Sequence, residues 1–235
     1  MADAVRNNAA WCDSVCSAHG GRGELSRFHW LCRTPMPSFY PNLVTLDPSL
    51  EPAIAAVREL ERVRPATSWS VKDSFGVLPL EEVGFRLLFE AEWIFRPARA
   101  ERSRSRARVG RWSRVRSEAA LAEWEAAWGE SRGLPRIFVP ALLPRSEIAI
   151  LAAHDGKGAI EAGVVANRSG NAVGPSSFFA RAEEGGSLRA EGIEVAIDAF
   201  PGLPLVGYEA GEDLAAVRML GFRSLGSLRV WVREG

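Results

Sequence analysis

The sequence predicts an α+β fold in which a mixed, twisted sheet is flanked by helices and one supersecondary unit occurs twice. Strand-like and helix-like segments alternate along the 235 residues, which suits three layers of secondary structure. The segment 83–96, "VGFRLLFEAEWIFR", and the segment 219–233, "MLGFRSLGSLRVWVR", share Gly-Phe-Arg followed by an apolar strand. An arginine-rich segment separates them. A repeated ending on each side of a change in composition favours internal duplication.

The composition is that of a soluble globular protein. Apolar residues make up 47% and charged residues 25%, and the 29 basic residues balance the 29 acidic ones. The absence of net charge gives no support for nucleic acid or an anionic membrane as a partner. No apolar run approaches the ~18 residues that a membrane helix needs, and the start lacks the basic and apolar regions of a secretory signal. The three cysteines favour reduced thiols in a cytoplasmic protein.

In the first half, apolar periodicity predicts an opening helix that ends at Gly20-Gly21, followed by alternating strands and helices. Asp47 or Ser49 is suited to cap the second helix. The expected segments are 3–21 (helix), 28–32 and 42–46 (strands), 47–63 (helix), 68–75 (strand), 78–85 (short helix) and 86–95 (strand).

In the second half, the same signals predict a longer series of elements. A turn at Asp155-Gly156 joins two antiparallel strands, and Ser187 is expected to open a helix. The expected segments are 109–115 (strand), 118–129 (helix), 147–156, 158–170 and 171–180 (strands), 185–200 (helix), 203–209 (strand), 212–220 (helix) and 222–233 (strand).

The two halves correspond over their last elements. Gly84-Phe85 matches Gly221-Phe222, and we expect both glycines at helix C-termini with positive φ. Trp93 and Trp231 follow these glycines by nine and ten residues, so the match slips by one position. We place the boundary near residue 104, which gives a partial domain at 1–103 and a complete one at 104–235.

The arginines around this boundary are interpreted as a solvated linker, with contact to RNA phosphates as the alternative. They are Arg96, Arg99, Arg102, Arg104, Arg106, Arg108, Arg111, Arg114 and Arg116.

A metal site could be imagined from the cysteines and histidines near the N-terminus, but their spacing matches no zinc pattern, and cysteines on an apolar helix stripe are usually core residues. The residues concerned are Cys12, Cys16, His19, His29 and Cys32. We predict no metal.

Residues 105–235 resemble a complete GCN5-related N-acetyltransferase (GNAT) fold, and residues 1–100 resemble a degenerate partial copy. The resemblance rests on a strand, a helix, a strand, a short helix ending in Leu220-Gly221-Phe222, and a final strand. It implies an acyl-CoA N-acyltransferase-like fold, acetyl-CoA as co-substrate, and a small-molecule or peptide amine as acceptor. A non-catalytic ligand-binding or assembly module is the alternative, and an aminoacyl-tRNA-dependent transferase is a weaker one. The sequence leaves a homodimer open.

The resemblance places the CoA pyrophosphate at the loop "ARAEEGGSL", between a strand and a helix. Backbone N–H groups and a helix N-terminus can hold an anion there. The loop departs from the family pattern in its glycine spacing, and Glu183 and Glu184 add negative charge; the alternative is a plain strand-to-helix turn. The expected cofactor-binding residues are Phe178, Phe179, Ala180, Arg181, Gly185, Gly186 and Ser187.

The family often uses a tyrosine on the last short helix as the acid that protonates the departing thiolate, but the matching residue here is Val217. Tyr208 and Glu209, at the end of the preceding strand, are the nearest substitutes, with tyrosine as acid and glutamate as base. The alternative is that Tyr208 is a half-buried strand residue and that Glu209 belongs, with Glu212 and Asp213, to the acidic start of the next helix.

Overall fold

The computed structural model describes residues 1–63, 68–98, 111–129, 136–181 and 185–234. The elements of the first half are α1 (Ala2–Ala18), β1 (Gly23–Leu25), β2 (His29–Cys32), β3 (Leu43–Thr45), α2 (Leu50–Val63), β4 (Trp69–Asp73), the 3-10 helix η1 (Leu80–Val83) and β5 (Arg86–Arg96). Those of the second half are β6 (Trp112–Arg114), α3 (Glu118–Gly129), the 3-10 helix η3 (Pro140–Leu142), β7 (Ile148–His154), β8 (Ile160–Ser169), β9 (Ala172–Ala180), α4 (Gly185–Ala199), β10 (Leu205–Glu209), α5 (Gly211–Met219) and β11 (Arg223–Arg233).

The predicted elements and their order agree with these bounds, apart from the additional short strand β1 and the short helix η3. Ser187 does not open its helix, because α4 begins at Gly185 and includes both glycines. Before α2, the Asp47 carboxylate accepts a hydrogen bond from the backbone N–H of Ser49 at 3.0 Å. This bond forms a turn ahead of the helix, which begins at Leu50, and is not a cap on the first turn of the helix.

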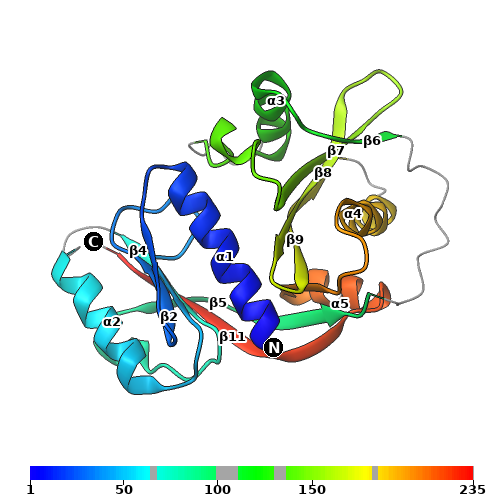
Figure 1. Cartoon of the computed structure of the whole chain (residues 1–235). Coiled ribbons are helices and arrows are strands. Elements are labelled where there is room, and N and C mark those ends of the chain that lie inside the picture. The colour runs from blue at the N-terminus through cyan, green and yellow to red at the C-terminus, as the bar shows by residue number, and fades with distance from the viewer. Residues whose placement is uncertain (64–67, 99–110, 130–135, 182–184, 235) are drawn as a thin grey trace.

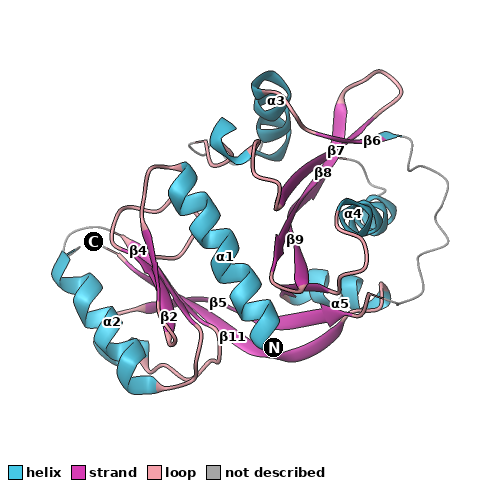
Figure 2. Ribbon diagram, viewed as in Figure 1, coloured by secondary structure: helices cyan, strands magenta, loops and turns pink. Residues whose placement is uncertain are grey.

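All the strands form one mixed sheet in the order β1-β2-β3-β4-β11-β5-β10-β9-β8-β7-β6. The last strand of each half lies beside a strand of the other half: β5 pairs antiparallel with β10, and β11 pairs antiparallel with β4. The two last strands also pair with each other along most of their length, and both run from one half to the other along the lower side of the molecule in Figures 1 and 2. The expected mixed sheet with flanking helices is therefore present, and it is continuous across the two halves.

The helices cover both faces of this sheet. Trp93 and Val206 pack with Val5 of α1, whereas their neighbours Ile94 and Leu205 pack in the core formed with α4 and α5. Since successive residues of a strand point to opposite faces, α1 lies on one face of the central strands and α4 and α5 lie on the other. This arrangement leaves the ends of β9 and β10 between two helical layers.

The two last strands share their irregularities as well as their length. Gly84 has φ 84° after η1 and Gly221 has φ 86° after α5, so the expected positive φ is confirmed at both. Leu88 of β5 and Leu225 of β11 are each left out of the ladder at a register shift. Each leucine follows its glycine by four residues.

The structure revises the match between the two tryptophans. Counted from the glycines, Trp93 occupies the place of Val230, and Trp231 occupies the place of Ile94. All four residues are buried. The two tryptophans therefore occupy neighbouring positions of the matched strands, and the one-residue difference does not require an insertion in either strand.

The solvated-linker interpretation is wrong for the two members of the arginine run that bind carboxylates inside the fold. Arg96 is buried and lies 3.1 Å from a carboxylate oxygen of Glu194, and Arg111 lies 2.7 Å from Glu161. Burial of a guanidinium is costly unless it is paired with an opposite charge, which explains the contact of Arg96 with Glu194. Arg99, Arg102, Arg104, Arg106 and Arg108 lie outside the described residues.

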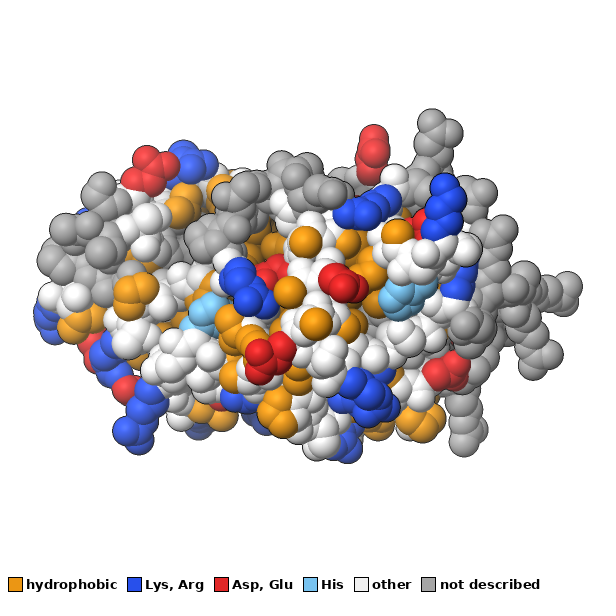
Figure 3. Space-filling model, turned by 90° about the horizontal axis from the view of Figure 1, so that it is seen from above, with side chains coloured by type: hydrophobic (Ala, Val, Ile, Leu, Met, Phe, Trp, Pro, Cys, Tyr) orange, Lys and Arg blue, Asp and Glu red, His pale blue; other side chains and the backbone are white. Residues whose placement is uncertain are grey.

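The cysteines are core residues. Cys12, Cys16 and Cys32 pack with Trp30 and Val44. Among the described residues, no three His, Cys, Asp or Glu side chains are grouped to hold a metal ion. No helix in the described ranges is long and apolar enough to cross a membrane. On the face in Figure 3, the described acidic and basic side chains are interspersed with hydrophobic ones.

Gly84 allows a direct test of the turn that starts β5. A methyl group on Gly84 would meet no heavy atom within 4 Å, so Gly84→Ala changes only the backbone preference at φ 84°. We expect the free energy of unfolding, measured in urea, to fall by about 1 kcal/mol. Gly129→Ala is the matched control, since Gly129 ends a helix and its added methyl is equally unhindered. An equal loss in the control would contradict the role of φ.

Candidate functional site

The site lies where β9 and β10 separate. The two strands are parallel, and the structure describes every residue of both. They pair at Leu205 and Val173. Beyond this pair, β9 carries a bulge, because Ser176 lies opposite Val165 and Phe179 lies opposite Gly163. Two residues, Ser177 and Phe178, therefore occupy the place opposite one, and Ser177 takes a left-handed φ of 54°. The bulge and the divergence leave one edge of β9 facing a gap in the sheet.

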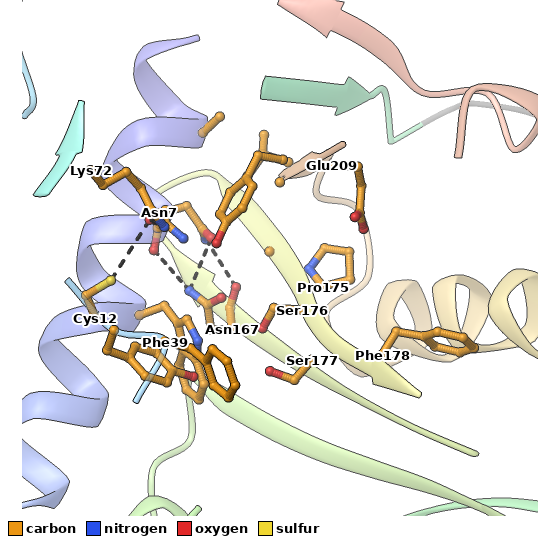
Figure 4. Close-up of a pocket in the computed structure, with 18 of the residues that line it drawn as sticks. Asn7, Cys12, Phe39, Lys72, Asn167, Pro175, Ser176, Ser177, Phe178 and Glu209 are labelled. Carbon is orange, nitrogen blue, oxygen red and sulfur yellow. Dashed lines mark hydrogen bonds between the residues drawn. The ribbon is translucent and has the colours of Figure 1, made fainter. Parts of the chain in front are cut away.

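Two cavities meet at this gap. The larger, of about 290 Å³, lies beside α1 (Figure 4), and the smaller, of about 50 Å³, lies beneath α4 and α5. The two cavities share the residues that line the gap. A ligand in either cavity therefore contacts the same group of residues. The shared residues are Pro175, Ser176, Ser177, Phe178, Arg189, Gly207, Tyr208 and Glu209.

Glu209 is the carboxyl group among the residues that the two cavities share. Burial raises the pKa of its carboxyl to about 7, although the nearby Arg189 guanidinium lowers it and Asp213 raises it. Arg189, on the first turns of α4, lies 3.4 Å from Glu209 and 2.5 Å from Asp213. Its guanidinium also lies over the ring of Phe178, 4.7 Å from the centroid. A carboxyl group with a pKa near neutrality can accept and return a proton at physiological pH.

Tyr208 lies beside Glu209 and lines both cavities. Its ring packs edge-on against Trp93 with centroids 5.6 Å apart and stacks on Phe89 at 6.5 Å. The ammonium of Lys72 lies over the same ring at 4.2 Å. The structure thus brings the predicted acid and base, Tyr208 and Glu209, to one gap.

Of the predicted cofactor-binding residues that the structure describes, Phe178 alone lines the two cavities, and the others lie around the end of β9 and the start of α4. The next residue, Phe179, points to the other face, where its ring meets Trp124 at 5.2 Å. Ala180 packs beside Leu188 at the start of α4. Arg181 is exposed at the end of β9, with its backbone N–H bonded to Glu161. Gly185, Gly186 and Ser187 form the first turn of α4.

Sequence reasoning missed several residues of the site. Lys72 lines the larger cavity from β4, Asn7 and Asn8 line it from α1, and Arg189 reaches it from α4. One signal was present: Lys72 is one of two lysines in the sequence and interrupts an apolar strand. The contribution of α1 had no local signal, since it depends on contacts between residues more than 150 positions apart, such as Asn7 and Asn167.

Comparisons with solved structures place the chain among GNAT-like folds. A GCN5-related N-acetyltransferase from Kribbella flavida aligns with TM-score 0.67 and 14% identity, over 99% of this chain and 96% of that one. One from Sphaerobacter thermophilus aligns with TM-score 0.56 and 11% identity, over 100% and 93%. Saccharomyces cerevisiae N-myristoyltransferase with bound myristoyl-CoA aligns with TM-score 0.54 and 8% identity, over 77% and 55%.

No family model matches the sequence, and no curated protein matches it. At these identities, the likeness establishes an acyltransferase-like fold with a mixed sheet and flanking helices. It leaves the activity to be argued from the site.

The Glu209 carboxyl should titrate near pH 7 when followed by carbon-13 NMR, with Glu209→Gln used to assign its signal. Arg189→Met should move this pKa further upward, because it removes the cation that favours the ionised form. Arg62→Met, on the exposed face of α2, is the control and should leave the pKa of Glu209 unchanged. A pKa that falls in Arg189→Met would show that Arg189 does not stabilise the carboxylate.

Proposed function

We propose that the protein is an acyl-CoA-dependent N-acyltransferase that moves an acetyl group from acetyl-CoA to an amine. The observation that carries this proposal is the gap between β9 and β10, which joins two cavities and has the carboxyl group of Glu209 beside it. A passage through a sheet lets donor and acceptor approach from opposite faces and meet at one point. The similarity to GNAT folds supports this assignment.

The donor is assigned to the side of α4. The free edge of β9 offers backbone groups to the amides of the pantetheine arm, and the first turn of α4, from Gly185 to Ser187, offers N–H groups to the pyrophosphate. Arg181 lies between them at the end of β9. The cavity beneath α4 and α5 is small and apolar on its inner side, where Val217 and Phe222 line it, which suits a short acyl group.

The acceptor is assigned to the side of α1 and meets the donor at the gap. The side chain of Tyr208 lies on the α1 side and that of Glu209 on the α4 side, but both residues line both cavities, so each is assigned a role at the gap itself. Glu209 takes a proton from the ammonium form of the acceptor, and the free amine attacks the carbonyl carbon of the thioester. The C–N bond forms, the C–S bond breaks, and the thiolate of CoA leaves with the electron pair. Tyr208 gives this thiolate a proton and regains one from solvent. Glu209 begins the cycle in the protonation state that its role needs, because a pKa of about 7 keeps much of this carboxyl group ionised at neutral pH.

A non-catalytic module with the same fold is the second candidate, and two observations favour it. Val217, which stands where the family often has a tyrosine, is buried in the core and has no proton to give. Glu209 is also held by Arg189. A non-catalytic protein would bind CoA without turnover, or would not bind it. The aminoacyl-tRNA-dependent alternative gains nothing from Arg96 and Arg111, which are engaged in ion pairs.

We further propose that the chain arose by duplication of a GNAT-like unit, whose first copy lacks a counterpart of β6. The pairing supports this origin: β2-β3 is antiparallel and β3-β4 parallel, as β8-β9 is antiparallel and β9-β10 parallel. The matching bulges at Leu88 and Leu225 support it too. An experimental structure in which residues 39–96 do not superpose on residues 174–233 would contradict the duplication.

Acetyl-CoA should raise the melting temperature of the protein, since a ligand that binds the native state stabilises it. Arg181→Glu should weaken binding, because a carboxylate replaces a cation beside the proposed pyrophosphate site. Arg62→Glu makes the same change of charge on α2 and should bind acetyl-CoA as the wild type does. If the two variants bind acetyl-CoA with equal affinity, the pyrophosphate site lies elsewhere. If acetyl-CoA does not raise the melting temperature of the wild type or of either variant, CoA dependence is refuted.

Turnover should depend on the two residues at the gap. Glu209→Gln and Tyr208→Phe should each lower the rate by roughly 10²–10⁴, while CoA affinity stays nearly unchanged. The wild-type rate should rise as pH increases through about 7, because Glu209 must be ionised to accept a proton. Release of free CoA from acetyl-CoA in the presence of amines measures both effects. Full activity of Tyr208→Phe would remove tyrosine from the acid role.

A further inference from the structure

We infer that the cavity beside α1 binds an amine that also carries a carboxylate and an apolar or aromatic body, with Lys72 as the partner of the carboxylate. This inference deepens the proposed function, since it names the chemical class of the acceptor, and it rests on that function in calling this ligand an acceptor. The cavity, the buried cation and the aromatic lining carry it.

Lys72 is a buried cation at the cavity wall. Only 3% of its surface is exposed, yet it lines the larger cavity from β4. Its ammonium donates a hydrogen bond to Asn8 Oδ1 at 2.8 Å and lies over the ring of Tyr208. Neither partner carries an opposite charge. Within the described ranges, no carboxylate lies close enough to Lys72 for an ion pair.

The carboxylates next to Lys72 in sequence and in the lining of the cavity are engaged elsewhere. Asp73 follows Lys72 on the strand, but it accepts the backbone N–H groups of Gly76 and Leu78 at 3.0 and 2.8 Å. Glu209 and Asp213, which also line the cavity, are paired with Arg189. A buried ammonium without a counter-ion is costly, so an anionic group of the ligand is the partner that this site lacks.

Lys72 and Glu209 lie on different sides of the cavity (Figure 4). The ring of Tyr208, which lines the same cavity, contacts the Lys72 ammonium. They come from β4 and β10, the strands that flank the central pair. A ligand with an amine and a carboxylate matches both groups at once: the amine lies toward the general base and the gap, and the carboxylate lies toward the ammonium. A simple amine would leave Lys72 unpaired.

One part of the cavity wall is aromatic. Trp11 and Tyr40 pack edge-on with centroids 6.2 Å apart, and Phe39 packs edge-on with Trp128 at 6.0 Å. All four line the cavity. Phe39 is 62% exposed and has a left-handed φ of 71°, an unfavourable conformation for an aromatic residue. The aromatic rings favour an apolar or aromatic side chain on the ligand.

The test compares ligands that differ only in the carboxylate. L-phenylalanine and phenethylamine form one pair, and L-leucine and 3-methylbutylamine form another. Each is titrated into the full chain by calorimetry, with and without saturating free CoA. We expect the member with a carboxylate to bind about 10-fold to 100-fold more tightly in at least one pair, which is the value of a charge-assisted hydrogen bond.

The Lys72→Met variant keeps the aliphatic stem and removes the charge, so it should abolish this preference for the carboxylate. Lys72→Arg should retain the preference. Lys157→Met, at an exposed turn, is the matched control and should behave as the wild type. Unliganded melting temperatures show whether each variant is folded.

The results separate this inference from the proposed function. If CoA binds but neither amino acid binds more tightly than its amine, or if Lys72→Met keeps the preference, the carboxylate site is refuted and the transferase proposal stands. If the amino acids bind through Lys72 and CoA does not bind, the site stands as a ligand site and the transferase proposal fails.

Discussion

The pairing of β5 with β11 is the interaction on which the rest of the structure depends. β5 is the last strand of the first half in sequence, and β11 is the last strand of the second half. In the sheet, each of them pairs with a strand of the other half: β5 with β10, and β11 with β4. The two halves are therefore joined by backbone hydrogen bonds as well as by side-chain packing. This exchange also sets the position of the site, because it brings Lys72 of β4 and Tyr208 of β10 into contact across the central pair.

The comparison of β4 with β10 shows how one strand position serves two purposes. Both strands have five residues, and each ends in a carboxylate, Asp73 or Glu209. Asp73 is fully buried and holds the following loop through its backbone N–H groups. Glu209 borders a cavity, and burial raises its pKa. The two carboxylates thus differ because of what surrounds the end of each strand. Asp73 is enclosed by the tight loop of residues 74–78, whereas Glu209 lies where β10 diverges from β9.

Much of the fold could be predicted from the sequence because its signals are local. Periodicity gave the helices and strands, and the Gly-Phe turns gave the ends of η1 and α5 with their left-handed glycines. Tyr208 and Glu209 could be singled out because they end a strand. The exchange of β5 and β11 could not be predicted, since both strands carry similar apolar patterns and either order would bury them. Lys72 and Asn8 were missed because the hydrogen bond between them depends on the packing of α1 beside β4, two elements that are distant in sequence.

The central place of β11 has a consequence for how the protein is made. The strands on either side of it, β4 and β5, are translated long before it, and each has an unsatisfied edge until Arg223–Arg233 has been added. A growing chain must keep these edges from pairing with other chains during that interval. Contacts between such distant segments also make folding slow compared with that of a helical protein of equal length. The edges of β4 and β5 that face each other across the sheet are therefore covered only when the final strand enters between them.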